Sequence, residues 1–204
     1  RGADLARRPS RLRSPKQTGI KPLLRQTIEA MDNVPVFIQN GRLDGVAANA
    51  LGEALFAPLM DSEVSFMNAA RFVFLDQRAQ EFYPEWEKVA QEIVPVLRAE
   101  AGKSPFDRAL TDLVGELSTR SEEFRQLWAS QNVREHRTGI KRIHHPLVGD
   151  LDLQFEVMTI ASEPGLQMFV FSAERGSPSQ IALQLLANLS ATFKDRSSTN
   201  EPAA

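Results

Sequence analysis

The chain has 204 residues, of which 42% are hydrophobic and 25% are charged, and its formal net charge is −2. These values are ordinary for a globular protein, and a chain of this length buries most of its apolar surface. The absence of cysteine excludes a disulfide framework, a thiolate nucleophile and a thiolate metal site. No apolar run approaches the roughly 18 residues of a membrane span, and no signal-peptide pattern opens the sequence. We therefore expect a cytoplasmic protein that does not contact the membrane.

Residues 1–19 are basic and polar, and they are interrupted by Pro9 and Pro15. Such a segment either contacts an anionic surface such as nucleic acid or is a solvated linker. We interpret it as a linker from an upstream segment, since the first residue is not methionine. The polar stretch 194–204 is interpreted as a disordered tail. One folded domain over 20–193 remains between the two.

The first elements follow from proline, asparagine and glycine signals. Pro22 stands at a plausible first helical position, and the helix it opens should end before Pro35. Two apolar runs then flank Asn40-Gly41, the strongest short-range signal of a β-hairpin. Asn49 is the expected N-cap of a short helix that follows.

The middle of the chain is predicted to be helical. Residues 66–75 are mostly apolar, which indicates a buried helix. Pro84 opens a second helix, in which Pro95 predicts a kink or a break. Ser104 and Ser121 are the expected N-caps of two further helices.

The pattern changes period near the end of the chain. Residues 151–157 alternate between apolar and polar side chains, which predicts a strand with one solvated face. A strand over 138–144 should precede it. Residues 166–172 are apolar on both faces, as expected for a central strand. Ser177 then opens a helix whose apolar residues are Ile181, Leu185, Leu189 and Phe193.

Two early strands and three late strands most economically form one sheet. The predicted fold is therefore α+β, a five-stranded antiparallel sheet with a large helical insertion packed on it.

No residue pattern points to catalysis. The glycine-rich phosphate loop, the dinucleotide-binding turn and the nucleophile elbow are all absent from the sequence. Of the three histidines, His144 and His145 are adjacent on a predicted strand and so point to opposite faces, which makes a shared metal ion difficult. We expect one solvated and one packed imidazole, no metal and no cofactor.

Asn68 and Arg71 are polar residues within the apolar stretch 66–75. An arginine in such surroundings needs a partner and suits a carboxylate. It is either the anchor of an acidic ligand or one half of an internal salt bridge to Asp76 or Asp61. Other candidate ligand-binding residues are aromatic, and by default these belong to the core: Phe74, Trp86, Phe124, Trp128 and Phe155.

Seven segments occur in an order that resembles a known family. They are 42–51, 68–76, 82–86, 113–118, 124–128, 144–149 and 173–178. Together they resemble the ligand-binding domain of MmyB-like bacterial transcription regulators, over about residues 22–189. Two departures stand out: Asn40-Gly41 tightens the first hairpin, and His144 stands where the family more often has arginine or an aromatic residue.

The resemblance implies a PAS-like fold, an upstream helix-turn-helix domain that binds DNA, and a small apolar ligand such as a fatty acid. We expect a ligand-binding cavity between the sheet and the helices. Arg71 with Asn68, or alternatively His145, should anchor the carboxylate of the ligand. We also expect a homodimer. The alternatives are a ligand-free dimerisation or partner-docking module and, as a third reading, an enzyme acting on small acyl compounds.

Overall fold

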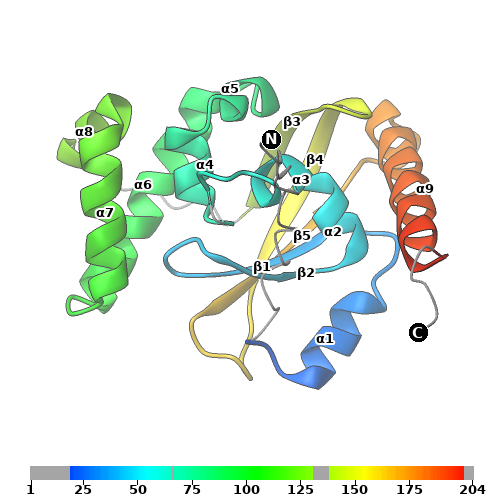
Figure 1. Cartoon of the computed structure of the whole chain (residues 1–204), viewed down its shortest axis with the longest axis horizontal. Coiled ribbons are helices and arrows are strands. Elements are labelled where there is room, and N and C mark those ends of the chain that lie inside the picture. Colours follow the sequence, from blue (N-terminus) through cyan, green and yellow to red (C-terminus); the bar gives the residue numbers. More distant parts are fainter. Residues whose placement is uncertain (1–18, 66, 131–137, 200–204) are drawn as a thin grey trace, which may run out of the picture.

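The computed structural model describes residues 19–65, 67–130 and 138–199, and its centre is one five-stranded sheet (Figure 1). The strands are β1 (Val36–Asn40), β2 (Gly45–Ala48), β3 (Thr138–His145), β4 (Gly149–Thr159) and β5 (Leu166–Ser172). All neighbouring strands are antiparallel, in the order β2-β1-β5-β4-β3. The predicted α+β, PAS-like sheet is confirmed, and β5 is its central strand as its two apolar faces indicated.

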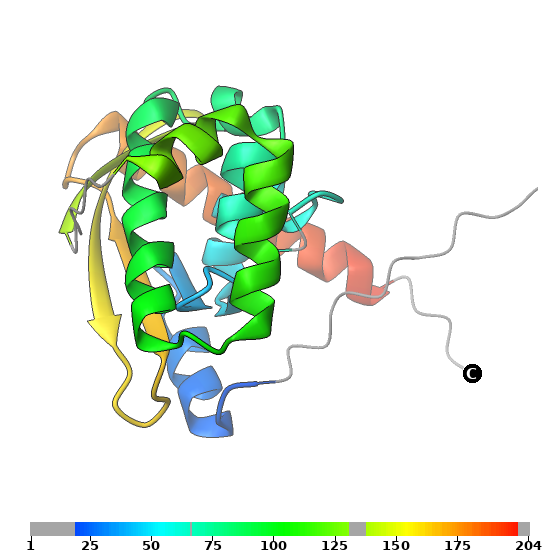
Figure 2. The same cartoon turned by 90° about the vertical axis from the view of Figure 1, so that its left-hand side faces the viewer.

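The helices of the described residues fall into a helical insertion and three separate elements. The separate ones are α1 (Pro22–Glu29), α2 (Ala50–Leu55) and α9 (Pro178–Thr199). The rest form the insertion between α2 and β3: α3 (Ala57–Met60), α4 (Ala69–Leu75), α5 (Arg78–Phe82), α6 (Trp86–Lys103), α7 (Arg108–Arg120) and α8 (Glu122–Ala129). Figure 2 shows α6, α7 and α8 as a layer standing in front of the sheet.

Alternation along the strands divides the sheet into two faces. On β1, Val36 and Ile38 pack with Ile28 of α1 on the outer face. Phe37, between them, belongs to the core on the inner face, where Phe155 and Phe171 also lie. The inner face is therefore the one that faces the helical insertion.

Several helix starts are confirmed in atomic detail. The Asn49 side chain accepts a hydrogen bond from Gly52 N at 2.8 Å, and Ser121 Oγ accepts one from Phe124 N at 3.1 Å. Ser177 Oγ accepts from Gln180 N at 3.2 Å. Each bond satisfies a backbone donor that a helix leaves free in its first turn.

The N-cap predicted at Ser104 is wrong, because Ser104 ends α6 and the cap of α7 is Asp107. The Asp107 carboxylate accepts from Leu110 N at 3.2 Å and from Arg42 Nη1 at 2.9 Å. The arginine comes from the first hairpin, 65 residues away in sequence, so this partner is invisible to a local pattern. Phe106, directly before this cap residue, is 95% exposed.

The first hairpin has a longer connection than Asn40-Gly41 suggested. β1 ends at Asn40 and β2 begins at Gly45, so the turn is not a tight two-residue one. Asn40 Oδ1 accepts from Arg42 N and Asp44 N at 2.9 and 3.0 Å, and Leu43 takes the positive φ of 67°. The asparagine therefore organises a wider loop through its side chain.

Two long helices extend further than expected. α6 runs through Pro95, so the break expected there as one alternative to a kink is wrong, and Ile93, Val94 and Leu97 around the proline are buried. α9 extends to Thr199, past Lys194, where we expected a disordered tail; no proline or glycine interrupts that stretch. Residues 200–204 and 1–18 lie outside the described residues.

α9 buries a different face from the one its spacing indicated. Ile181 is 66% exposed and Leu185 is 49% exposed, whereas Leu183 and Leu186 are buried. Ser179 Oγ accepts a hydrogen bond from Asp152 N of β4 at 2.9 Å, which helps to fix the rotation of the helix on the sheet.

Candidate ligand-binding cavity

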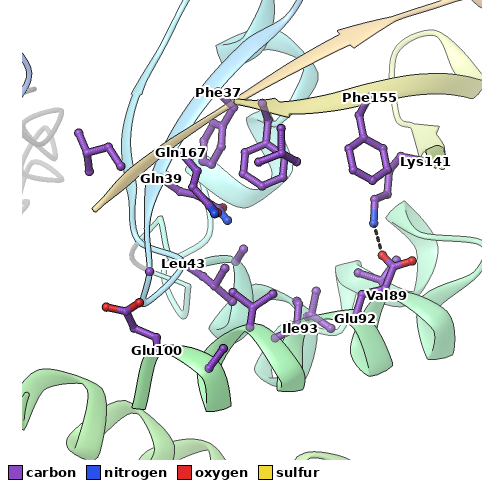
Figure 3. A pocket seen from close by; sticks show the side chains of 18 of the residues that line it. Phe37, Gln39, Leu43, Val89, Glu92, Ile93, Glu100, Lys141, Phe155 and Gln167 are labelled. Carbon is purple, nitrogen blue, oxygen red and sulfur yellow. Dashed lines mark hydrogen bonds and ion pairs between the residues drawn. The ribbon is translucent and has the colours of Figure 1, made fainter. Parts of the chain in front are cut away.

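A cavity of about 540 Å³ lies between the inner face of the sheet and α6. Its size falls in the usual range of small-molecule sites, roughly 300–1,000 Å³. Figure 3 shows Phe37 and Phe155 on the sheet side and Val89 and Ile93 on the helix side.

The walls are mainly apolar. The sheet supplies aromatic rings, and Phe169 and Phe171 of β5 add to those of Phe37 and Phe155. Helix α6 supplies small and branched aliphatic side chains at helical spacing. Leu43 of the first hairpin and Val73 of α4 close the sides. The cavity is thus suited to an apolar ligand of modest width.

One ion pair spans the cavity. Lys141 Nζ of β3 donates to Glu92 Oε2 of α6 at 2.7 Å, and the two side chains are 19% and 21% exposed. The same ammonium lies 5.6 Å from the centroid of the Phe155 ring, a cation–π distance. An ammonium has three donors, so Lys141 retains capacity for a second acceptor.

Tyr83 also lines the cavity. Burial, and secondly the negative charge of Glu92, raise the pKa of its phenol. The phenol therefore stays neutral and remains a potential hydrogen-bond donor.

A second polar region lies on β1, β5 and the end of α6. Gln39 and Gln167 are cross-strand neighbours, and Figure 3 shows both amides pointing into the cavity. The carboxylate of Glu100 lies over Gly41, where an added Cβ would meet it at 2.2 Å. Glycine at position 41 thus lets the first hairpin approach α6.

Of the residues predicted to bind a ligand, Phe155 lines this cavity. Asn68 is instead the N-cap of α4, and its side chain accepts from Arg71 N at 3.0 Å. Its amide nitrogen donates to Arg42 O and to Asp44 Oδ1 at 2.9 and 2.8 Å. These bonds join α4 to the first hairpin.

Arg71 is in an internal salt bridge, but its partner is Glu116 of α7 rather than Asp76 or Asp61. Arg71 Nε donates to Glu116 Oε2 at 2.8 Å, and Arg120 donates to the other carboxylate oxygen at 2.8 Å. Partial burial opposes ionisation of Glu116, but the hydrogen bonds and charges of the two arginines outweigh it and lower its pKa. The structure thus places Arg71 outside the cavity lining.

The predicted aromatic residues Phe74, Trp86, Phe124 and Trp128 form one cluster within the helical insertion. The Phe74 ring lies 5.0 Å from Phe124 and 6.3 Å from Trp86, centroid to centroid. Phe124 stacks on Trp128 at 5.5 Å. This cluster joins α4, α6 and α8 and does not contribute to the cavity lining.

His145 is the packed imidazole and His144 the solvated one, as the alternation along a strand predicted. The ring of His145 has both nitrogens occupied: Nε2 donates to Ala54 O at 3.0 Å, and Nδ1 accepts from Leu147 N at 3.2 Å. Burial lowers its pKa, so the neutral ring is favoured. These contacts hold β3 against α2, away from the cavity.

Sequence reasoning missed Lys141, Glu92, Gln39 and Gln167. Two signals were available. Gln39 follows the apolar run 36–38 on an inward-facing position, and Lys141 shares its strand face with Ile143 and His145. Both patterns place a polar group where a core residue is expected.

Two features are absent from the described residues. No group of three or more histidine, aspartate or glutamate side chains among them is arranged to hold a metal ion. Within the same ranges, no helix has the length and apolar character to cross a membrane.

The PAS-like sheet and its largely apolar cavity define a class of small-molecule-sensing domains. Comparison with family models identifies which one. The model described as the MmyB-like transcription regulator ligand binding domain matches residues 20–186, most of the chain, and the protein belongs to that family. No curated protein matches the chain. The family is one of regulator domains and is not a known enzyme class.

Proposed function

We propose that this chain is the effector domain of a bacterial transcription regulator and senses a small apolar acid, such as a fatty acid, in the cavity between the sheet and α6. The observation that carries the proposal is the cavity itself, which combines about 540 Å³ and apolar walls with one partly buried lysine. A ligand-free dimerisation module would need no such space. We propose that the domain acts by binding and carries out no reaction.

Apolar contact supplies most of the affinity in this proposal. Each buried methylene of an acyl chain contributes about 0.8 kcal/mol, before the cost of ordering the ligand. Five phenylalanine rings and the aliphatic face of α6 are the surfaces that the chain would contact.

Lys141 is the carboxylate anchor in this proposal. It replaces Arg71, Asn68 and His145, whose polar groups are engaged elsewhere. Glu92 and the ligand carboxylate would share the ammonium of Lys141, because Nζ has three donors.

The route from ligand to DNA starts at the turn between β4 and β5. Gly165 and Leu166 of this turn line the cavity. Its neighbours hold the start of α1: Lys21 N donates to Glu163 Oε1 at 2.9 Å, and Lys21 Nζ donates to Ser162 O. A ligand that shifts the turn would therefore shift α1 and the segment 1–19 before it.

We further propose that this segment is the linker to an upstream helix-turn-helix domain. The regulator would work in the cytoplasm as a homodimer, so that ligand binding changes the spacing of two DNA-binding domains.

Mass spectrometry tests the proposal directly. The purified chain is measured under native conditions and again after solvent extraction, and the extract is analysed for lipids. We expect a stoichiometric acyl compound that excess hexadecanoic acid displaces. A protein that carries no such compound and binds no member of a fatty-acid panel would contradict the proposal.

A further inference from the structure

The cavity wall contains a glutamine for which the described residues supply no hydrogen-bond partner. Gln39 is 7% exposed, and it follows the apolar residues Val36, Phe37 and Ile38 of β1. Among the described residues, no hydrogen bond to its side-chain amide is found. Figure 3 shows this amide directed from the sheet toward α6, beside that of Gln167.

Gln167 is a second glutamine of this kind, next to Gln39. It is opposite Gln39 in the antiparallel register of β1 and β5, so the two side chains leave the sheet on the same face. Its amide is likewise without a protein hydrogen bond in the part of the chain that the structure describes. Together the two glutamines offer two carbonyl acceptors and two amino groups.

The two amides open onto the cavity, since no fully buried side-chain nitrogen or oxygen of the described residues lacks a hydrogen-bond partner. Water can therefore hydrate them in the empty cavity, and a ligand that displaces this water must offer the amides a partner of its own. The carboxylate of an acid does not meet this need if it binds at Lys141, because Lys141 lies on β3, two strands away from β5. Figure 3 likewise shows the Lys141–Glu92 pair and the glutamine pair in separate parts of the cavity. A plain fatty acid would lay methylene groups against the two amides.

We propose that Gln39 and Gln167 form a second polar subsite, and that the ligand is an acyl chain carrying a hydroxyl group. A hydroxyl matches the pair, since it donates to one amide oxygen and accepts from the other amide nitrogen. The inference rests on the proposed function, because it uses the same cavity and the same acid anchor.

Calorimetric titration of the delipidated chain tests the subsite. The probes are hexadecanoic acid and a series of monohydroxylated hexadecanoic acids with the hydroxyl at successive positions. One position should bind about three- to tenfold more tightly than the plain acid, the gain expected for one or two hydrogen bonds. In Gln39→Leu this gain should disappear while the plain acid still binds.

Gln167→Leu, at a less buried position on the same wall, should reduce the gain in the same way and serves if Gln39→Leu does not fold. Gln91→Leu on the exposed face of α6 is the matched control and should leave the ratio unchanged. If the plain acid binds and every hydroxylated acid binds equally or more weakly, the subsite is refuted and the proposed function stands. A preference that survives both leucine variants also refutes the subsite. Failure of all the acids to bind overturns the proposed function and the subsite with it.

Discussion

Lys141 on β3 and Glu92 on α6 form a 2.7 Å ion pair that ties the sheet to the helical insertion across the cavity. The pair makes this end of the cavity electrically neutral. Glu92 consequently competes with a ligand carboxylate for the same ammonium, and its charge opposes an anion at short range.

Replacing Glu92 with glutamine should therefore strengthen the binding of acids. The change removes the competing charge and keeps the size of the side chain, and we expect an affinity increase of about three- to tenfold for hexadecanoic acid. Loss of the ion pair should lower the free energy of unfolding by about 1 kcal/mol or less. Titration calorimetry and urea unfolding measure the two effects. Weaker binding of the acid by a folded variant would show that Glu92 does not oppose the ligand.

Filling the cavity should weaken binding strongly. Val96 lines the cavity from α6, and Val96→Trp would occupy space that an acyl chain needs. We expect at least tenfold weaker binding of hexadecanoic acid. Val114→Trp on α7, which is also half-buried but lies outside the cavity lining, is the matched control and should bind normally. If the two variants bind hexadecanoic acid with equal affinity, the ligand does not bind in this cavity.

Asn49 should be a major determinant of stability. Its side chain accepts from Gly52 N and Val36 N, and donates to Met31 O and Val34 O, at 2.7–3.0 Å. Asn49→Ala removes the cap of α2 and leaves buried backbone groups unpaired, at an expected cost of about 2–4 kcal/mol. Asn49→Asp keeps the acceptor for Gly52 N and Val36 N but sets a carboxylate oxygen against the carbonyl oxygens of Met31 and Val34, so it should also be destabilising. Chemical denaturation measures both, and a loss below about 0.5 kcal/mol for the alanine variant would contradict the network.

Stability should also depend on the protonation of His145. Burial lowers its pKa in the folded state below the ordinary 6.5, so the unfolded chain takes up the proton first. The contribution of the neutral ring is therefore fully present above about pH 6.5 and is lost as the pH falls toward the lower folded pKa. The free energy of unfolding is measured with urea at about pH 7.5 and about pH 5.5. Between these two values it should decrease less for His145→Gln than for the wild type. An equal decrease in both proteins would assign the pH dependence to other groups.

Local periodicity was sufficient to predict the sheet and most helices. The alternation of β4 and the two apolar faces of β5 depend only on neighbouring residues, and so do the caps at Asn49 and Ser121. Features that depend on distant partners were missed or misplaced. Arg42 binds the cap residue Asp107 from another element, and Ser179 binds β4 and so orients α9.

The site was harder to predict for the same reason. The family resemblance led us to expect a cavity between the sheet and the helices, and the structure has a cavity between the sheet and α6. The sequence does not reveal which polar residues face that space. Arg71 looked exceptional in its apolar surroundings, but Glu116, 45 residues away, already neutralises it. Lys141 looked like an ordinary residue of a strand, and only the fold places it opposite α6.

The anchoring of an acid by Lys141 is the central claim, and one comparison tests it most directly. The affinity for hexadecanoic acid is measured by calorimetry for the wild type, Lys141→Met and Arg71→Met, together with hexadecanol as an uncharged ligand of the same length. We predict that Lys141→Met weakens acid binding about tenfold or more and leaves hexadecanol binding nearly unchanged, whereas Arg71→Met binds both like the wild type. Loss of acid binding in Arg71→Met with retention in Lys141→Met would contradict the account.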